Sequence, residues 1–386
     1  MNARVAPADA STIDRAAAPA RIVLLGTGTV GRAVLARLAD WSGTPFGARL
    51  SLVQVANSRA AIASASGLQP RGVLARLSGG GQPSRLDTVA QALAGGDAGD
   101  VHRPGKGRHG RSRRIVIDAT ASDDVAGRHA AWLSQGIDVV TACKLGQGTS
   151  LARWQAIRTA RAGAGTHYGD SATVGAGLPL LRSIRELQSG GDRIHAIAGV
   201  LSGSLAWLFD HYDGQRRFSD CVREARDAGY TEPDPRDDLS GEDVRRKLLI
   251  LARAAGVALE ERDVEVASLL PARLAALPRE QVDLAWPSLD ALLQGRHREA
   301  HARGERLRFL ARVEIAASGR AAARVGLESL AAGHPLRGGS GTDNRVAIWS
   351  DRYRAQPLLV QGPGAGAGVT AAALLDDVLR IAGHGR

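Results

Sequence analysis

Aromatic residues, cysteines and long hydrophobic runs are all scarce in this chain. Phe, Trp and Tyr make up 4% of the 386 residues, so the core must consist mainly of Val, Leu, Ile and Ala. Two cysteines, Cys143 and Cys221, cannot form a disulfide framework, so we expect reduced thiols and a cytoplasmic location. No segment approaches the roughly 18 consecutive apolar residues of a membrane helix, and residues 1–20 lack the apolar segment of a secretory signal. The sequence therefore disfavours a disulfide-rich secreted protein, and we expect no membrane partner.

Motifs for catalytic metals and thiols are also missing. The chain has neither a CxxC nor an HExxH motif, and His167 and His195 do not have the spacing of metal ligands. We therefore expect no catalytic transition metal and assign structural roles to both histidines. Cys143 lacks a recognisable His–Asp partner set, which disfavours a catalytic thiol.

Arginine and glycine are abundant instead. The chain has 50 basic residues, almost all of them Arg, against 39 acidic ones, which gives a net charge of +11 and a pI near 10.7. Such an excess is one indication of nucleic-acid binding. However, residues 102–114 concentrate much of it in a Gly-rich stretch without aromatic residues that stack on bases. This composition favours a solvated loop, and we expect no nucleic-acid partner.

From residue 21 onward the pattern is that of an α/β protein. Ile22–Leu25 is a short apolar run typical of a strand buried on both faces. Further strands are expected at 50–55, 115–117 and 137–141, with helical patterns between them. This alternation predicts a Rossmann-type, doubly wound parallel sheet. We expect this domain to cover 21–165, with a disordered leader at 1–20, a flexible Gly/Arg-rich insertion at about 78–114, and a C-terminal helix within 362–386 that completes it.

Beyond residue 165 the alternation ends. Helical patterns at 178–187 and 243–255 mix with the strand-like runs 195–200, 307–315, 345–349 and 358–361. We therefore expect a second, α+β domain over 166–361. A length of 386 residues is consistent with two modest domains.

A glycine-rich loop joins the first predicted strand to the first predicted helix. Gly26, Gly28 and Gly31 form a GxGxxG motif that also contains Thr27 and Val30. In this context the glycines allow a tight turn and close approach of a pyrophosphate, while the helix N-terminus attracts its negative charge. The motif predicts a dinucleotide site; a ligand-free glycine turn is the alternative.

The end of the second predicted strand bears on the choice of cofactor. An Asp or Glu there would bind the ribose hydroxyls of NAD, but residues 55–59 contain no carboxylate. Arg59 offers a charge partner for a 2′-phosphate. We therefore expect NADP(H) to be preferred over NAD(H), unless Arg59 is only a solvated loop cation.

The segment 229–247 is the most informative part of the second domain. It carries several acids around two prolines and runs into a helix on which Asp243 and Lys247 are four residues apart, hence on one face. An exposed ion pair is one interpretation. The apolar residues 248–251 indicate a buried helix, so the pair is expected to face a cleft, where an ammonium can bind a polar substrate and donate a proton. Lys144, after the strand 137–141, is a second candidate because ligands bind at the carboxyl ends of such strands.

Together these motifs resemble the homoserine dehydrogenase family, most closely the dehydrogenase half of the fused aspartokinase–homoserine dehydrogenases. The matching segments are residues 26–31, 55–58, 139–144, 172–179, 199–204, 229–247 and 362–373. The resemblance implies NADPH-dependent, reversible reduction of L-aspartate 4-semialdehyde to L-homoserine, in the biosynthesis of threonine, isoleucine and methionine. We expect a free-standing dehydrogenase without kinase or regulatory domain.

The resemblance also implies roles for individual residues. Lys247 would donate the proton, Lys144 would assist near the carbonyl and the nicotinamide, and Glu232 and Asp243 would hold the substrate. Further cofactor contacts are implied at Thr120, Gly229 and Gly366. Family members pair through the sheet of the second domain, so a homodimer is expected.

Two departures from the family pattern stand out. Cys143 replaces a usual Asn, and Ser171 replaces a usual carboxylate. In relatives the latter region binds a monovalent cation, Na⁺ or K⁺, and the resemblance implies the backbone carbonyls of Val174, Ala176 and Leu178 as ligands. Two rival interpretations remain: a cofactor-binding sensor that has lost catalysis, and a dehydrogenase for a different small amino-aldehyde.

Overall fold

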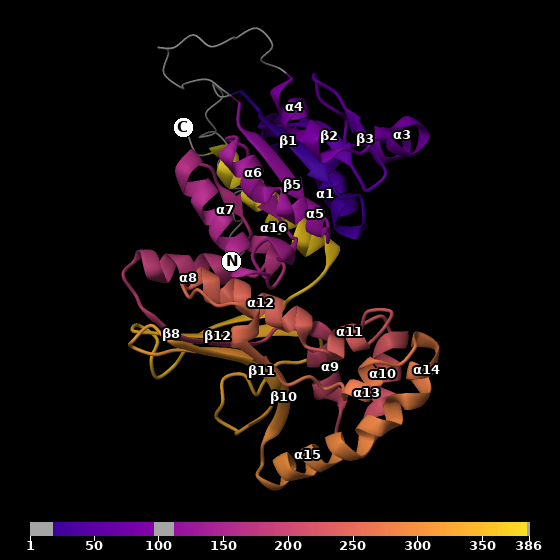
Figure 1. The fold of residues 1–386 in the computed structure, drawn as a ribbon, viewed down its shortest axis with the longest axis vertical. Coiled ribbons are helices and arrows are strands. Elements are labelled where there is room, and N and C mark those ends of the chain that lie inside the picture. Colours follow the sequence, from indigo (N-terminus) through magenta and orange to yellow (C-terminus); the bar gives the residue numbers. More distant parts are fainter. Residues whose placement is uncertain (1–17, 96–111, 384–386) are drawn as a thin grey trace, which may run out of the picture. The chain divides into compact units, whose positions relative to one another are not determined.

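The computed structural model of the protein describes residues 18–95 and 112–383, which fall into two compact units (Figure 1). The first unit comprises Met1–Cys143, Ala156–Asp170 and Ala367–Arg386, and the second comprises Lys144–Gln155 and Ser171–Gly366. The predicted boundary at residue 165 is therefore wrong for Lys144–Gln155, which belong with the second unit. Most of the predicted leader lies outside the described residues, but Ala20 already belongs to a strand.

The first unit contains a seven-stranded sheet of order β4-β3-β2-β1-β5-β6-β7. Its strands are β1 (Ala20–Leu25), β2 (Leu50–Ala56), β3 (Ala60–Ala63), β4 (Gln82–Pro83), β5 (Arg114–Asp118), β6 (Asp138–Thr141) and β7 (Tyr168–Gly169). Five neighbouring strands, β2, β1, β5, β6 and β7, pair in parallel. The strands β3 and β4 extend the β2 edge of the sheet in antiparallel orientation. Ile22, Val23 and Leu24 on β1 are fully buried, as a strand covered on both faces requires. The predicted doubly wound sheet is confirmed.

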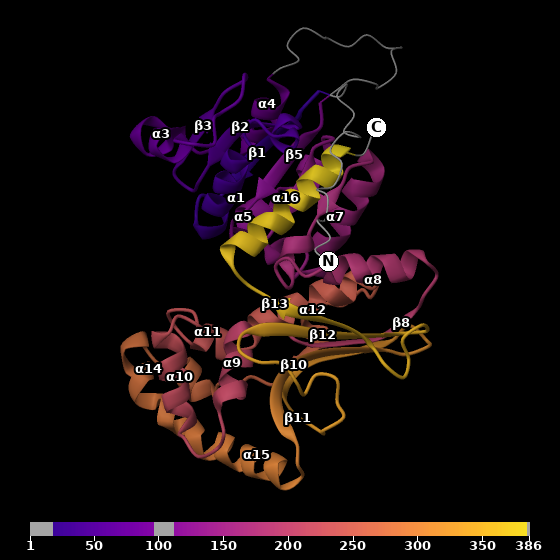
Figure 2. The ribbon, with the colours of Figure 1, turned by 180° about the vertical axis from the view of Figure 1, so that it is seen from behind.

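Helices flank this sheet. They are α1 (Thr29–Asp40), α2 (Pro45–Ala48), α3 (Val73–Gly80), α4 (Val89–Ala94), α5 (Asp123–Gly127), α6 (His129–Ser134), α7 (Leu151–Ala164) and α16 (Ala367–Gly383). The terminal helix α16 packs against α1 (Figure 2). Arg49 donates a hydrogen bond from its guanidinium to the carbonyl of Leu379 at 2.9 Å. Residues 362–366 belong to the second unit, so the returning segment begins at Ala367 and not at 362.

The predicted flexible insertion at 78–114 is wrong in its described parts. Residues 82–94 contribute β4 and α4, and Val89 and Leu93 of α4 are buried in the core at 0% and 1% exposure. Two apolar residues four apart are enough to dock this short helix, although Gly and Ala surround them. Arg113, assigned to a solvated loop, is buried and forms an ion pair with Asp138 at 3.2 Å. Residues 96–111 lie outside the described residues.

The second unit contains a six-stranded sheet of order β13-β12-β8-β10-β11-β9, antiparallel except for the β11–β9 pair. Its strands are β8 (Ile194–Val200), β9 (Val264–Val266), β10 (Arg306–Ile315), β11 (Ala321–Leu330), β12 (Asp343–Ser350) and β13 (Leu358–Pro363). Two helices, α8 (Leu180–Ser189) and α12 (Glu242–Ala254), pack on one face, where Ile197, Leu248 and Phe309 are buried. The predicted α+β class is confirmed.

The remaining helices of the second unit gather beside the sheet (Figure 1). They are α9 (Gly203–His211), α10 (Phe218–Asp227), α11 (Arg236–Leu239), α13 (Ala272–Ala275), α14 (Arg279–Ala285) and α15 (Asp290–Ala302). Their shared core includes the fully buried Phe218 and Trp286. Across the parts of the chain that are described, no helix has the length and apolarity needed to cross a membrane.

Candidate active site

The helix α12 carries Asp243 and Lys247 on one face. It begins after Gly241, which adopts a left-handed φ of 79°, and the Glu242 N–H donates to the Ser240 hydroxyl at 3.2 Å. Asp243 lies in the first turn, where a negative charge is favoured by the helix dipole. Its carboxylate meets the Lys247 ammonium at 2.8 Å. The expected i, i+4 ion pair therefore forms, and its lysine is largely enclosed, with 13% of the side chain exposed.

The Lys247 ammonium has a second partner. It donates a hydrogen bond to the carbonyl oxygen of Leu201, which follows β8, at 2.7 Å. An ammonium has three N–H donors, and these two acceptors are its only partners among the residues that the structure describes. One donor therefore remains for an acceptor on a bound molecule.

Lys144 reaches the same carboxylate from a different segment. Its ammonium lies 3.3 Å from Asp243 Oδ1, while Lys247 contacts Oδ2. The loop after Lys144 packs tightly on α12, because a Cβ at Gly148 would lie 2.8 Å from the Lys144 carbonyl oxygen and 2.9 Å from that of Arg246. Only glycine fits at this position.

Asp243 therefore lies between two cations. Burial alone would raise the pKa of Asp243, but the charges of Lys247 and Lys144 outweigh it and hold that pKa well below its usual range. The carboxylate stays ionised at any physiological pH, and it fixes two ammonium groups side by side.

A second polar cluster follows Leu201 directly. Ser202 caps α9 by accepting from the Leu205 N–H at 3.2 Å, and its hydroxyl lies 2.8 Å from that of Ser204. Ser204 donates to Asp238 Oδ1 at 2.5 Å, and the Glu232 N–H donates to Asp238 Oδ2 at 2.8 Å. Burial raises the pKa of Asp238, while these hydrogen bonds oppose the rise. The cluster joins the Pro-rich acidic loop to the end of β8.

Sequence reasoning gave Ser202, Ser204 and Asp238 no role in a site; at most Asp238 was a candidate cap for α12, and in the structure it binds Ser204 instead. A usable signal existed, because a Ser-Gly-Ser run at the end of a buried strand is a capping pattern and marks the carboxyl edge of a sheet. Glu232 itself has an exposed side chain and a backbone held by Asp238. It is thus available to a ligand.

Gly229 and Gly366 both lie in the second unit. Gly229 is exposed in the loop after α10 with a left-handed φ of 75°, and Gly366 is the last residue before α16 with φ of 124°. Next to Gly229, Tyr230 stacks on Trp207 with ring centroids 5.1 Å apart. This stack supports the loop that also carries Glu232.

The loop of the first unit that contains the GxGxxG motif fits a pyrophosphate. A Cβ at Gly26 would lie 2.6 Å from the Ala119 carbonyl oxygen, and one at Gly31 would lie 1.9 Å from the Gly26 carbonyl oxygen. These two glycines are required by packing. In contrast, a Cβ at Gly28 would meet nothing within 4 Å, and no side chain caps α1 at this residue. Open space and uncapped N–H groups coincide where an anion would bind.

Thr27 and Arg59 come together at the same edge of the sheet. The side-chain amide of Asn57 donates to the Thr27 hydroxyl at 3.4 Å, and its oxygen accepts from the backbone N–H groups of Arg59 and Ala60 at 2.8 Å. Arg59 is exposed at the tip between β2 and β3, and no acid of the described residues pairs with it. Its guanidinium is free to bind an anionic group. Val30, in the first turn of α1, is half-buried.

A buried network orders the turn at Thr120. The backbone N–H and the hydroxyl of Thr120 donate to Asp118 Oδ1 at 2.9 and 2.6 Å. The other oxygen of Asp118 accepts from the Thr141 hydroxyl at 3.0 Å and lies 3.1 Å from His129 Nε2. Asp118 and His129 are both fully buried, and His129 Nδ1 lies 2.9 Å from the Tyr168 hydroxyl. Sequence reasoning missed this network because its members come from four separate segments.

The segment proposed to hold a monovalent cation forms a strained turn. Gly175 and Ala176 have left-handed φ values of 73° and 49°, and Ala176 is the one non-glycine with positive φ among the described residues. The Leu178 carbonyl already accepts a hydrogen bond from the Leu180 N–H at 2.8 Å. Val174 is fully buried. No group of three or more His, Cys, Asp or Glu side chains suited to a metal occurs within 18–95 and 112–383.

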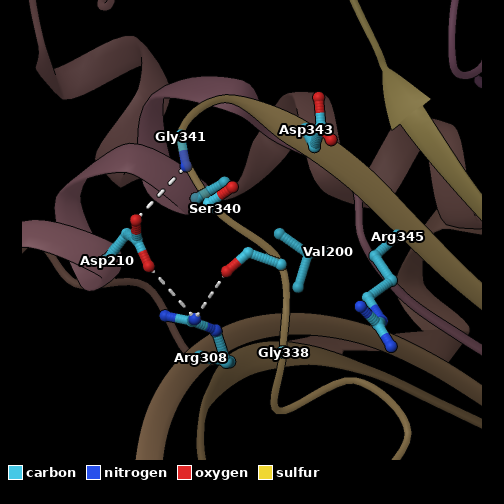
Figure 3. Close-up of a pocket in the computed structure, with 10 residues that line it drawn as sticks. Val200, Asp210, Arg308, Gly338, Ser340, Gly341, Asp343 and Arg345 are labelled. Atoms are coloured by element: carbon cyan, nitrogen blue, oxygen red, sulfur yellow. Dashed lines mark hydrogen bonds and ion pairs between the residues drawn. The ribbon is translucent and has the colours of Figure 1, made fainter.

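A small cavity elsewhere in the second unit does not resemble a binding site (Figure 3). It measures about 10 Å³, which is room for a single water. The buried Arg308 beside it donates to the Phe209 carbonyl at 2.7 Å and pairs with Asp210 at 3.4 Å. Asp210 in turn accepts from the Gly341 N–H at 3.2 Å. Through Phe209 and Asp210, the contacts of Arg308 hold the loop that contains Gly341 in place.

Cys143 and the two noted histidines have structural contacts. The Cys143 N–H donates to the Thr141 hydroxyl at 2.8 Å, and its side chain is buried. His167 lies against Asp138 at 3.3 Å, and His195 lies 2.7 Å from Asp351.

Comparison with known proteins matches both units to one enzyme family. A family model described as homoserine dehydrogenase matches residues 179–379, and one described as homoserine dehydrogenase, NAD binding domain, matches residues 26–169. The homoserine dehydrogenase of Emericella nidulans is 37% identical over 70% of this chain and 75% of its own length. The chloroplastic bifunctional aspartokinase/homoserine dehydrogenase 1 of Zea mays is 37% identical over 94% of this chain. The chain spans 38% of the length of that maize protein.

Solved structures share the fold. A Candida auris protein of unknown function superposes with a TM-score of 0.84 at 31% identity, over 94% of this chain and 98% of its own. A hyperthermophilic archaeal homoserine dehydrogenase in complex with NADPH gives a TM-score of 0.68 at 20% identity, over 94% and 97% of the two chains. At that identity the second match shows the fold alone.

Proposed function

Because this chain belongs to the homoserine dehydrogenase family of NAD(P)-dependent oxidoreductases, we propose that it interconverts L-aspartate 4-semialdehyde and L-homoserine with NADP(H) as the preferred cofactor. The observation that carries this proposal is that the Lys247 and Lys144 ammonium groups lie 2.8 and 3.3 Å from the same carboxylate, that of Asp243. A protein that only bound a nucleotide would not need two lysines fixed on one carboxylate.

In the proposed reaction, Lys247 is the general acid. When bound, a reduced nicotinamide cofactor would supply the hydride for the aldehyde carbon, and negative charge would then develop on the carbonyl oxygen. The Lys247 ammonium stabilises this charge and transfers one proton to the oxygen, which yields the alcohol. Asp243 and the Leu201 carbonyl orient the ammonium, and in the reverse direction the neutral amine takes the proton from homoserine.

Lys144 assists at the same oxygen, and the acids bind the rest of the substrate. The exposed Glu232 carboxylate is positioned for the substrate's ammonium group, and Asp238 holds the backbone of Glu232 in place. Asp243 contributes a second negative charge. A substrate with an ammonium, a carboxylate and a carbonyl oxygen complements this mixture of two cations and several acids.

The chain's use of lysine supports this assignment. Of its 50 basic residues only three are lysines, namely Lys106, Lys144 and Lys247. Arginine is always charged in proteins and cannot give up a proton, whereas lysine can. In a chain that otherwise uses arginine for positive charge, two of the three lysines lie on Asp243.

The proposed NADP(H) preference rests on Arg59. It is an exposed cation beside the phosphate loop and is linked to that loop through Asn57. Residues 55–59 contain no carboxylate that could bind the ribose hydroxyls of NAD. We propose that the cofactor also contacts Thr27, Val30 and the turn at Thr120. Further contacts are proposed at Gly229 and Gly366. A Na⁺ or K⁺ ion on the carbonyls of Val174, Ala176 and Leu178 also stays a proposal.

The proposed assembly is a homodimer formed through the face of the second unit's sheet that lies opposite α8 and α12. Trp349 and Ala196 line an open groove of about 710 Å³ on that face, together with side chains from β10 and β11. A second copy would bury this surface. Sedimentation or light scattering would show a mass of twice 40.3 kDa if the proposal holds.

The direct test of function is an absorbance assay of the purified chain with L-homoserine and either NADP⁺ or NAD⁺. We expect fast reduction of NADP⁺ and slow reduction of NAD⁺. Preference for NAD⁺ would contradict the role of Arg59 and leave the reaction intact. Cofactor binding without turnover would favour a sensor that has lost catalysis, and turnover only with another amino alcohol would identify a different amino-aldehyde substrate. We also propose a role in amino-acid biosynthesis, and we keep the cytoplasmic location expected from the two reduced cysteines as a proposal.

A further inference from the structure

Arg253 is a buried cation near the end of α12 whose partners are all uncharged. It is 2% exposed. One guanidinium nitrogen donates to the Gln147 carbonyl at 2.5 Å, and the Leu259 carbonyl accepts from two others at 2.7 and 3.3 Å. No carboxylate among the described residues forms an ion pair with it. The ring of Trp154 lies 5.9 Å from its Cζ.

Such an arrangement is costly. A charge taken out of water without an opposite charge loses solvation that hydrogen bonds to carbonyls only partly replace. Burial accordingly lowers the pKa of Arg253 to about 10, although Glu260 and Glu261 oppose this shift. A long apolar side chain would fill the same volume without this cost, so the guanidinium's donors must serve a purpose.

The Gln147 carbonyl belongs to the loop that begins with Lys144. The Gly148 N–H donates to the Lys144 carbonyl at 2.7 Å, which closes a turn over these residues. Past this turn, the Leu151 N–H donates to the Glu260 carboxylate at 3.0 Å. The loop is therefore held against α12 and the segment after it at several points, and the Lys144 ammonium contacts Asp243 on the same helix.

We propose that Arg253 is a positioning residue that holds the 144–148 loop against α12 and so places the Lys144 ammonium at Asp243. Lys144 has a long side chain that is 33% exposed and would otherwise be mobile. A planar guanidinium binds the Gln147 and Leu259 carbonyls at once, whereas a lysine ammonium is a point charge on a flexible stem. The proposal rests on the proposed function only in that Lys144 assists the reaction.

A double-mutant cycle tests the proposal. Misplacement of a reacting group by about 1 Å costs up to ~100-fold in rate, so we expect Arg253→Met to lower kcat by roughly 10- to 100-fold. If Arg253 acts through Lys144, adding Arg253→Met to Lys144→Met should cost less than about 3-fold more, because coupled residues are not additive. The same loss in both backgrounds would overturn the proposal.

Arg308 provides a matched control. It is also buried, also donates to a backbone carbonyl, and burial likewise lowers its pKa to about 10. It lies beside the small cavity of Figure 3 and contacts neither Lys144 nor Gln147. Arg308→Met should lower the melting temperature as Arg253→Met does, while any change in kcat should be the same with and without Lys144. Coupling of Arg308 to Lys144 would contradict the specific role of Arg253.

Hydrogen exchange gives a readout that does not depend on activity. Arg253→Met should raise deuterium uptake across residues 144–151, and Arg308→Met should not. Arg253→Lys, which keeps the charge and guards against failure to fold, should give a smaller local increase in uptake and a correspondingly smaller loss of kcat. Unchanged uptake in the folded Arg253 variants would overturn the proposal. An inactive wild type would instead overturn the proposed function, and the exchange experiment would still report on the loop.

Discussion

The phosphate loop of the first unit and the charged cluster of the second depend on opposite properties of their residues. The loop depends on the absence of side chains: a Cβ at Gly31 would lie 1.9 Å from the Gly26 carbonyl oxygen, and the space beside Gly28 is open. The cluster depends on charged groups, since the Asp243 carboxylate lies within 3.3 Å of each of two ammonium groups. The loop should therefore fail when volume is added, and the cluster should fail when a charge or its proton is altered.

The largest expected effect comes from the proton of Lys247. We expect both Lys247→Met and Lys247→Arg to lose at least ~100-fold in turnover, because general acid catalysis contributes about that much and arginine does not release a proton. The measurement is kcat for homoserine oxidation, with cofactor affinity followed by NADPH fluorescence. Cofactor affinity should stay unchanged. Near-normal turnover of a folded Lys247→Arg enzyme would show that charge alone matters here.

Added volume should break the phosphate loop in two distinguishable ways. Gly31→Ala places a methyl group against the Gly26 carbonyl and should cost about 1–3 kcal/mol of unfolding free energy, as overpacking does. Gly28→Ala meets no atom of the protein, so it should fold normally and weaken cofactor binding. Denaturation curves and NADPH titrations of both variants separate the effects. Unchanged NADPH affinity in Gly28→Ala would place the pyrophosphate elsewhere.

Beside the phosphate loop, the positive charge of Arg59 should determine the affinity for NADP⁺. Arg59→Gln should raise the KM for NADP⁺ by roughly 10- to 100-fold, because a hydrogen bond to a charged group contributes about 1.5–3 kcal/mol. The KM for NAD⁺ should not change. Arg76, an exposed arginine on α3, is the matched control and should affect neither cofactor. An equal rise for both cofactors would indicate a general effect on the loop.

The smallest expected effect is a pH-dependent loss of stability. The pKa of Asp243 is depressed in the folded state by its two lysines, so its ionisation stabilises the fold above the ordinary carboxyl pKa, near 3.9. This contribution is lost as pH falls through the lower folded pKa. Asp243→Asn should therefore be less stable than wild type at pH 7, and the difference should shrink below about pH 4. Urea denaturation at several pH values checks this, with the substitution Asp237→Asn at an exposed position of α11 as the control.

Some elements were predictable because their signal is local. The strand β1 contains the uninterrupted apolar run Ile22–Leu25, and the pair Asp243–Lys247 follows from helical spacing. The strand β11 was missed, because its alternation of Ala, Arg, Gly and Glu is weak, and its place between β10 and β9 depends on partners. Helix α4 was taken for a flexible loop because its two buried residues stand among glycine and alanine.

The sequence by itself determined the glycine-rich turn at residues 26–31, the alternation of strands and helices in the first unit, and the residues of the α12 ion pair. Each of these depends on neighbours within about one turn of helix or one tight turn, so spacing is sufficient. Only the tertiary structure decided that Lys144 reaches Asp243, that Ser204 binds Asp238, that Thr141 binds Asp118, and that Arg253 binds Gln147. These contacts join segments far apart in the chain, and their geometry follows from the packing of whole helices and strands.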